Sequence, residues 1–169
     1  RRNQAMRMLI DSFQPEGITE IAVDSIFMMP QLGVLSEVHE KAALEVFHKD
    51  CLIRLGTCIT PIGRSKPGEV VLTAKISMPD GSTMEQQLLK DQILKVDAPY
   101  EAMNTVLTPS KNTDIGAGIG QEIRTEIFGG TVGLIFDGRD RPINIPSDQE
   151  MRLRSLESWS DALNEYPRS

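Results

Sequence analysis

The sequence predicts an α/β start, then a β-rich barrel or sandwich domain, then a closing C-terminal helix. Three observations support this fold class. Apolar residues recur at helical spacing near the N-terminus, short segments separated by Gly and Pro run from Cys51 to about residue 145, and a capping motif at residues 147–150 precedes a second helical pattern. The change of character near Cys51 divides the chain into segments 1–50 and 51–169.

The first segment predicts two helices and one strand. Residues 2–13 carry apolar side chains at helical spacing, and Pro15 and Gly17 end that pattern. Residues 18–26 predict a short buried strand, and residues 39–49 predict a second helix. The apolar residues of the first helix are Met6, Leu9, Ile10 and Phe13, and those of the second are Ala42, Ala43, Val46 and Phe47.

Between the strand and the second helix, residues 27–33 read as an apolar loop. Loops usually face water, so an apolar loop is expected to pack on another part of the protein or on a partner. The candidate docking residues are Phe27, Met28, Met29 and Leu32.

The second segment predicts seven strands and a helix. Residues 70–76 alternate as a half-buried strand does, and many short strands at this spacing favour a barrel or a sandwich. Ser147 and Glu150 form the predicted capping box of the last helix. The predicted strands are 51–60, 69–77, 84–89, 92–97, 101–108, 121–128 and 131–137, and the helix has Leu153, Leu156, Trp159 and Leu163 on one face.

Composition excludes several classes of protein. A net charge of −6 argues against nucleic-acid binding, and no apolar run reaches the roughly 20 residues that span a bilayer. No secretory signal opens the chain, which begins without Met and is expected to be a fragment or a processed piece. Cys51, Cys58 and the two histidines have no metal-ligand spacing, and we expect reduced thiols, no metal and a cytoplasmic location.

A glycine-rich loop is the first candidate site. Asp114 precedes Gly116 and Gly118, as in loops that bind phosphate. The following residues alternate like a strand, whereas a phosphate loop leads into a helix. The pattern therefore favours a sharp turn between strands and leaves an anion-binding β domain as an alternative.

A second candidate lies in the segment GGTVGLIFDGRDRP at residues 129–142. Gly129 and Gly130 open a buried strand that ends in a tight turn with Asp137, Arg139 and Arg141. The two guanidinium groups can bind a phosphate or a carboxylate, or Asp137 can hold Arg139 inside the turn. A free-standing hydrolase that uses Asp24, Asp137 and an arginine is a further alternative. Its set of acid, base and nucleophile is incomplete in the sequence.

Several segments in series resemble one family. They are 14–20, 22–24, 29–35, 42–46, 50–57, 61–63, 114–118 and the Gly–Arg motif 129–142. Together they resemble the C-terminal third of the glutamate mutase accessory (MutL) family, whose members look like actin/Hsp70-type ATPases. One departure is Asp140, which stands where the family motif has Gly.

The resemblance implies a role and a partner. Residues 1–50 would be the tail of an actin-like ATPase core, and residues 51–169 an appended β-rich domain. The parent would bind ATP upstream of this chain, which itself would hold no cofactor and no catalytic residue. It would act as a chaperone or reactivating factor for an adenosylcobalamin-dependent mutase, by docking that client or by regulating the ATPase.

Overall fold

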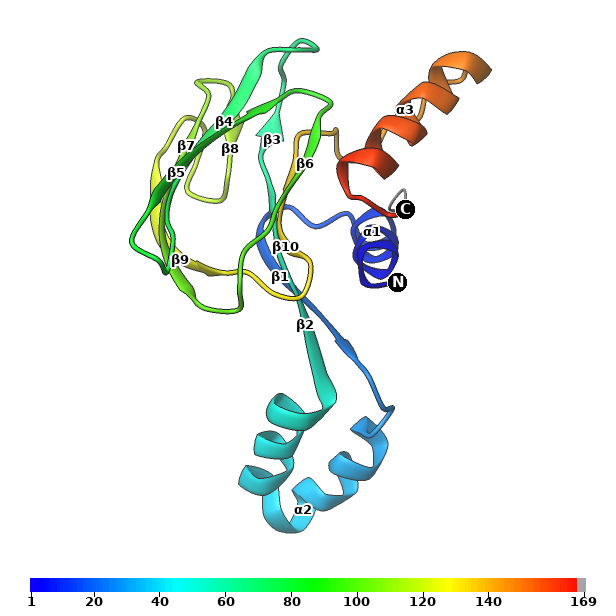
Figure 1. Cartoon of the computed structure of the whole chain (residues 1–169), viewed down its shortest axis with the longest axis vertical. Coiled ribbons are helices and arrows are strands. Elements are labelled where there is room, and N and C mark those ends of the chain that lie inside the picture. Colours follow the sequence, from blue (N-terminus) through cyan, green and yellow to red (C-terminus); the bar gives the residue numbers. More distant parts are fainter. Residues whose placement is uncertain (167–169) are drawn as a thin grey trace.

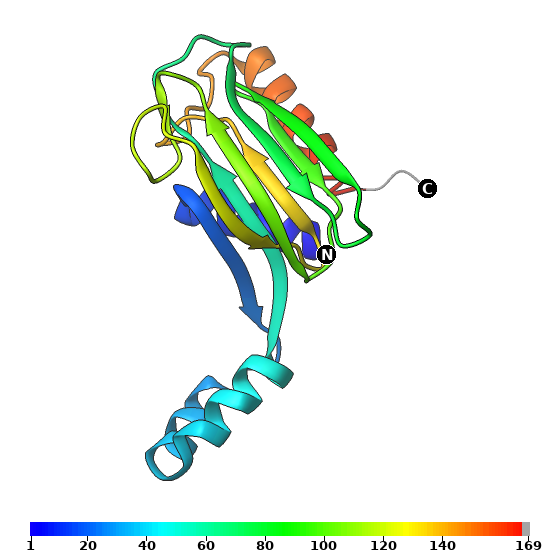
Figure 2. The same cartoon turned by 90° about the vertical axis from the view of Figure 1, so that its left-hand side faces the viewer.

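The structure is a computed structural model that describes residues 1–166. Two four-stranded sheets stack in a sandwich-like arrangement, with two helices beside the first sheet and a helical arm that projects from it (Figures 1 and 2). The chain starts with a helix and a strand and ends, in its described part, with a helix. The predicted fold class is therefore confirmed, and within residues 1–166 the strands form a sandwich rather than a closed barrel.

The first sheet combines strands from the early and the late part of the chain. Its strands, in spatial order, are β1 (Gly17–Asp24), β2 (Leu52–Thr60), β10 (Gly133–Asp137) and β6 (Ile93–Val96). β1 and β2 are antiparallel, whereas β10 runs parallel to β2. Segments 1–50 and 51–169 thus contribute to one sheet.

The second sheet comes wholly from the middle of the chain. Its strands, in spatial order, are β5 (Thr83–Leu89), β4 (Val70–Ser77), β7 (Ala102–Pro109) and β9 (Ile123–Phe128), all antiparallel. A two-stranded ladder of β3 (Ile62–Gly63) and β8 (Thr113–Asp114) was not predicted from the sequence. The seven predicted strands of this half all occur, within two residues of their predicted bounds.

Two apolar cores hold these layers. One contains buried residues of both sheets, such as Leu72, Met103 and Phe136, and the other lies between the first sheet and helices α1 (Arg2–Phe13) and α3 (Gln149–Ala162). Met6 and Ile10 of α1 are fully buried there, as their helical spacing predicts.

Helix α3 begins one residue later than the predicted capping box. Its N-cap is Asp148, whose Oδ1 accepts a hydrogen bond from the backbone N–H of Met151 at 2.9 Å. The prediction that Ser147 caps the helix was therefore wrong. Asp is as good an N-cap as Ser, so two adjacent capping residues leave the first turn ambiguous in the sequence.

Residues 25–51, here called the arm, form a helical hairpin. Helix α2 (Met29–Val46) contains a non-helical residue, His39 (φ −140°, ψ 65°), and a π-helix (Phe47–Cys51) completes the second leg. The prediction of a loop over residues 27–33 was wrong beyond Met28. Pro30 marks the first turn of the helix, where its missing N–H costs nothing.

The arm stands away from the sandwich on a stalk made by β1 and β2 (Figure 1). The register of this pair runs from Gly17 opposite Thr60 to Asp24 opposite Leu52. The arm has a small core of its own, with Leu32, Ala43 and Cys51 buried. Within residues 1–166 no helix is both long enough and apolar enough to cross a membrane.

Candidate functional site

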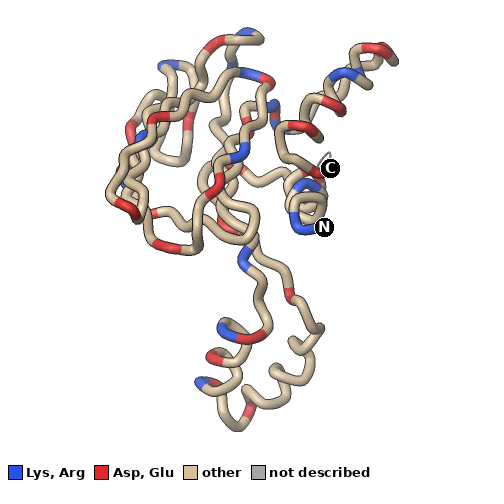
Figure 3. Tube along the Cα trace, in the orientation of Figure 1, with Lys and Arg blue, Asp and Glu red and all other residues tan. Residues whose placement is uncertain are grey.

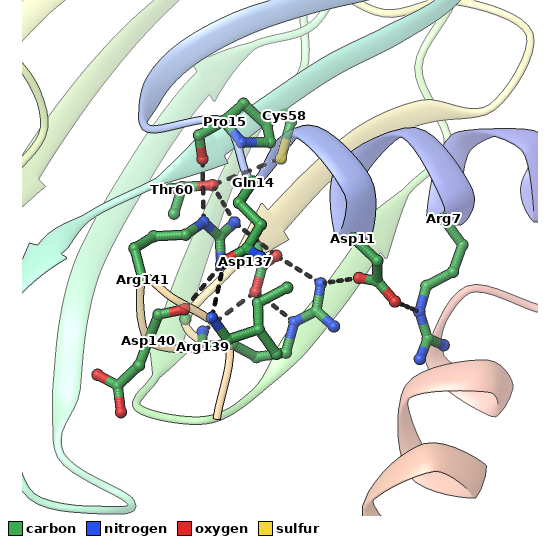
Figure 4. A network of polar contacts seen from close by, with 12 residues as sticks. Arg7, Asp11, Gln14, Pro15, Cys58, Thr60, Asp137, Arg139, Asp140 and Arg141 are labelled. Atoms are coloured by element: carbon green, nitrogen blue, oxygen red, sulfur yellow. Dashed lines mark hydrogen bonds and ion pairs between the residues drawn. The ribbon is translucent and has the colours of Figure 1, made fainter. Parts of the chain in front are cut away.

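The turn after β10 gathers three of the predicted site residues into one buried ion network (Figure 4). Arg139 donates from Nε to Asp137 Oδ1 at 2.8 Å and from Nη2 to Asp137 Oδ2 at 2.7 Å. Arg141 Nη2 also donates to Asp137 Oδ2, at 2.9 Å. Asp137 thus holds Arg139 inside the turn, as one of the two interpretations of the sequence expected, and it binds Arg141 as well.

Residues from α1 and from the chain end after α3 complete the network. Arg139 Nη2 lies 2.8 Å from Asp11 Oδ1, and Arg7 pairs with Asp11 at 2.6 Å and with Glu165 at 2.9 Å. Three guanidinium groups therefore face three carboxylates. The Arg139 guanidinium also lies 4.8 Å from the ring centre of Trp159, a cation–π contact.

Burial and pairing act against each other on these groups. Burial disfavours the charged form of Asp137, but the hydrogen bonds and charges of Arg139 and Arg141 outweigh it and hold the pKa of Asp137 below its usual range. Burial likewise opposes the charge of Arg139, and Asp137 and Asp11 raise its pKa nonetheless. All of these charges are matched inside the protein, so the network ties α1, β10 and the chain end together.

Asp140 in the same turn has a partner of its own. Its Oδ1 accepts a hydrogen bond from the buried Lys90 Nζ at 2.7 Å, and Lys90 also donates to Asp91 at 3.0 Å. Burial opposes the charge of Lys90, but Asp140 and Asp91 raise its pKa. Asp140 therefore takes part in a local ion pair.

Gly129 and Gly130 lie at the opposite end of β10 from Asp137, so the structure does not bring these predicted residues into one site. A Cβ on Gly129 would lie 2.2 Å from the carbonyl oxygen of Ala98, and one on Gly130 would lie 2.6 Å from that of Leu55. Backbone atoms approach too closely for any side chain. The pair serves strand packing.

Replacing Gly130 with Ala is expected to lower the free energy of unfolding by about 1–3 kcal/mol, because the added methyl group overpacks a backbone contact. Gly33→Ala is the matched control. It adds the same group to α2, where nothing lies within 4 Å, and it should stabilise the protein by about 0.5–1 kcal/mol. Urea denaturation measures both values, and equal effects of the two substitutions would contradict the packing explanation.

The loop at Asp114 satisfies its own backbone. Asp114 Oδ1 accepts hydrogen bonds from the N–H groups of Gly116 at 2.7 Å and Gly118 at 2.9 Å. These bonds hold the pKa of Asp114 below its usual range. A carboxylate thus occupies the position at which an external anion would meet those two donors, as in a self-capped turn.

Comparison of the chain with protein-family models, with curated proteins and with solved structures finds no match. The resemblance to the MutL family therefore stays a prediction based on the sequence segments. A function for this chain therefore has to follow from the contacts, burial and exposure of residues 1–166.

The carboxylates of the hydrolase alternative do not meet. Asp24 lies opposite Leu52 at one end of the β1–β2 pair, whereas Arg141 connects Asp137 to Thr60 at the other end. At about 3.3 Å per residue, the seven steps from Gly17 to Asp24 separate these ends by roughly 23 Å. In residues 1–166, no group of three His, Cys, Asp or Glu side chains is placed to hold a metal ion.

Exposed large apolar residues are concentrated on the arm. Of the predicted docking residues, Phe27 is 84% exposed and Met29 is 56% exposed, whereas Met28 is half-buried and Leu32 is buried in the arm's core. Six further apolar residues of the arm are exposed: Ile26, Val34, Leu35, Val38, Leu44 and Val46. Val34 and Leu35 were expected to be exposed as part of segment 27–35, whereas Val46 was expected to face inward.

Phe27 combines this exposure with an unusual backbone. Its φ is +57°, a left-handed conformation that a bulky residue rarely adopts. Asp24 Oδ1 holds the turn by accepting hydrogen bonds from the N–H groups of Ile26 at 3.1 Å and Phe27 at 3.0 Å. The protein thus keeps an aromatic ring in water, at the base of the arm, in a conformation that costs free energy.

Proposed function

We propose that this chain is a non-catalytic docking domain that binds a client protein through its arm. The observation that carries the proposal is the exposure of eight large apolar residues on a segment of 27 residues. Burying one such side chain stabilises a complex by about 1.5–3 kcal/mol. A concentration of exposed apolar side chains of this kind is typical of interaction sites in proteins.

The fold around the arm suits this role. The arm's core is small, with three buried residues, so a covering partner adds apolar contacts that the hairpin cannot make by itself. The paired strands of the stalk hold the hairpin clear of the sandwich (Figure 2). A partner that offers an apolar groove would receive the arm in the helix-in-groove manner.

The resemblance supplies the identity of the client within this proposal. The client is an adenosylcobalamin-dependent mutase, and the chain is the C-terminal part of a cytoplasmic chaperone or reactivating factor. Nucleotide binding belongs to the upstream part of the parent chain. The chain described here hydrolyses no ATP and contributes the surface that recognises the mutase.

The test is binding of purified glutamate mutase to the protein, measured by biolayer interferometry. Val34→Gln/Val38→Gln is expected to weaken binding by about tenfold or more, which is 1.4 kcal/mol or more, because the two exposed valines lie one turn apart on α2. The substitutions leave the arm's buried residues intact. Circular dichroism should therefore show the same fold as the parent.

The matched control is Met151→Gln/Leu153→Gln. These residues are exposed to a similar degree but lie on α3, so the change in surface polarity is comparable. Equal loss in both variants, or unchanged binding in the arm variant, overturns the proposal. Light scattering measures the oligomeric state of the parent and of the arm variant in parallel. If the parent is a dimer and the arm substitutions dissociate it, the arm binds a second copy of this chain and not a mutase.

A further inference from the structure

A wide cleft of about 530 Å³ lies where the arm meets the sandwich. Its charged side chains are all basic or imidazole groups: Arg2, His48, Lys49 and Arg54, beside Tyr100 and Thr131. We call these six residues the basic cleft. No Asp or Glu lines it, although the chain has 24 acidic residues and a net charge of −6, and acidic positions occur on both the sandwich and the arm (Figure 3).

Arg54 is held in place at the centre of this cleft. Its Nη1 donates to Glu20 Oε1 at 2.7 Å, and its guanidinium lies 4.8 Å from the ring centre of Tyr100. Tyr100 in turn packs against Phe128, with ring centres 5.4 Å apart. Glu20 offsets the charge of Arg54, so the unpaired positive charge of the cleft comes from Arg2 and Lys49. Arg54 offers a ligand its remaining N–H donors in a fixed position, which limits the conformational freedom lost on binding.

The two exposed cations of the cleft, Arg2 and Lys49, have no counter-charge in the described part of the chain. Among residues 1–166, no carboxylate lies within ion-pair distance of Arg2, His48 or Lys49. Arg2 and Lys49 are exposed to water, one from α1 and the other from the arm. Like charges that converge from separate elements attract an anionic ligand and steer its approach.

The shape of the cleft favours a polypeptide over a small anion. Small-molecule sites enclose most of their ligand, whereas this cleft is shallow and open to solvent. Its wall includes the apolar residues Leu52 and Ile53 beside the cations. We infer that the basic cleft receives an acidic segment of the client protein that docks on the neighbouring arm. The identity of the client rests on the proposed function, whereas the charge preference of the cleft does not.

The probe is a fluorescein-labelled peptide of ten residues rich in Glu, compared with the same peptide in which Gln replaces Glu. Fluorescence anisotropy with the full chain should show binding of the acidic peptide alone, and binding should weaken as salt is added. Arg2→Glu/Lys49→Glu should weaken it by about tenfold, because each substitution replaces attraction of the acidic peptide by repulsion at an exposed position.

The control Arg64→Glu/Lys111→Glu changes the net charge by the same amount at exposed positions outside the cleft, and should change binding less than about twofold. Equal weakening by both double variants overturns the inference, because the probe then reads net charge alone. Tighter binding of inorganic phosphate or of a single-stranded oligonucleotide overturns the assignment to an acidic polypeptide. Thermal melting verifies that each variant is folded.

The two proposals fail separately. Val34→Gln/Val38→Gln should lose the mutase and keep the acidic peptide, because the valines lie outside the cleft. If the protein binds the acidic peptide but does not bind the mutase, the proposed client is wrong and the charge preference of the cleft still holds. Binding of the mutase without the peptide would refute the cleft alone.

Discussion

Replacing Asp137 with Asn should lower the free energy of unfolding by about 3–5 kcal/mol at pH 7, because two buried guanidinium groups lose their shared counter-ion. Asp137 is fully buried and accepts hydrogen bonds from both Arg139 and Arg141. An amide is nearly the same size as a carboxylate, so the loss comes from charge and hydrogen bonding and not from a cavity. Guanidinium chloride denaturation, with fluorescence of Trp159 as the probe, measures the difference.

The pKa shift of Asp137 also predicts how the free energy of unfolding changes at acid pH. The pKa of Asp137 in the folded protein is held below the unfolded value of about 3.9. Its contribution is therefore complete above that unfolded value and is lost as the pH falls through the folded pKa. The gap between the parent and Asp137→Asn should be constant between pH 7 and pH 5 and should narrow below about pH 4.

Asp97→Asn is the control for this experiment. Asp97 pairs with Lys95, but its side chain is 90% exposed, so its removal should change stability by less than about 1 kcal/mol. A similar small effect of Asp137→Asn would mean that the buried network contributes no stability. A gap that widens as the pH falls would contradict the direction of the pKa shift.

Replacing Phe27 with Asn should change stability and binding in opposite directions. Asn tolerates the left-handed conformation of residue 27 better than Phe does, so the free energy of unfolding should rise by up to about 1 kcal/mol. Binding of the mutase should weaken by about 30-fold or more, which corresponds to the 2 kcal/mol typical of an aromatic anchor in an interface. Denaturation and biolayer interferometry give the two numbers.

Phe13→Asn serves as the matched control. Phe13 is 78% exposed, lies at the end of α1 outside the arm and has an ordinary helical backbone. Its replacement should leave binding unchanged and should not stabilise the protein. If Phe27→Asn stabilises the protein and still binds the mutase fully, the ring at position 27 is not the anchor.

Local patterns predicted most elements of this fold. The alternation of Val70, Leu72, Ala74 and Ile76 predicts one buried face, and the last three are buried. Val70 is exposed instead, because the register of β4 shifts between Val70 and Leu72. Met6 and Ile10 follow the helical period and are buried as well. These patterns succeed because the direction of a side chain in a helix or strand depends only on the geometry of its own element.

Local signals failed where two of them compete at neighbouring positions. Pro30 resembles a loop residue but lies in the first turn of α2, and Ser147 resembles an N-cap but precedes the actual cap, Asp148. In both cases the local signal belongs to a real feature of the chain, but the residue at which the helix begins differs from the predicted one. The choice depends on how the following turn packs, which the immediate neighbours do not decide.

Some contacts of the candidate site could likewise be predicted from the sequence, and others follow only from the tertiary structure. The sequence by itself determined most of the β-rich elements, both terminal helices and the tight turn after residue 136, and it offered the pairing of Asp137 with Arg139 as one of two alternatives. All of these depend on residues close together in the chain. Only the tertiary structure brought Asp11 to Arg139, 128 residues away, and left Val34 and Val38 uncovered on the arm. Burial and ion pairing depend on which distant segments meet, and that is settled when the sheet joins β1, β2 and β10 into one layer.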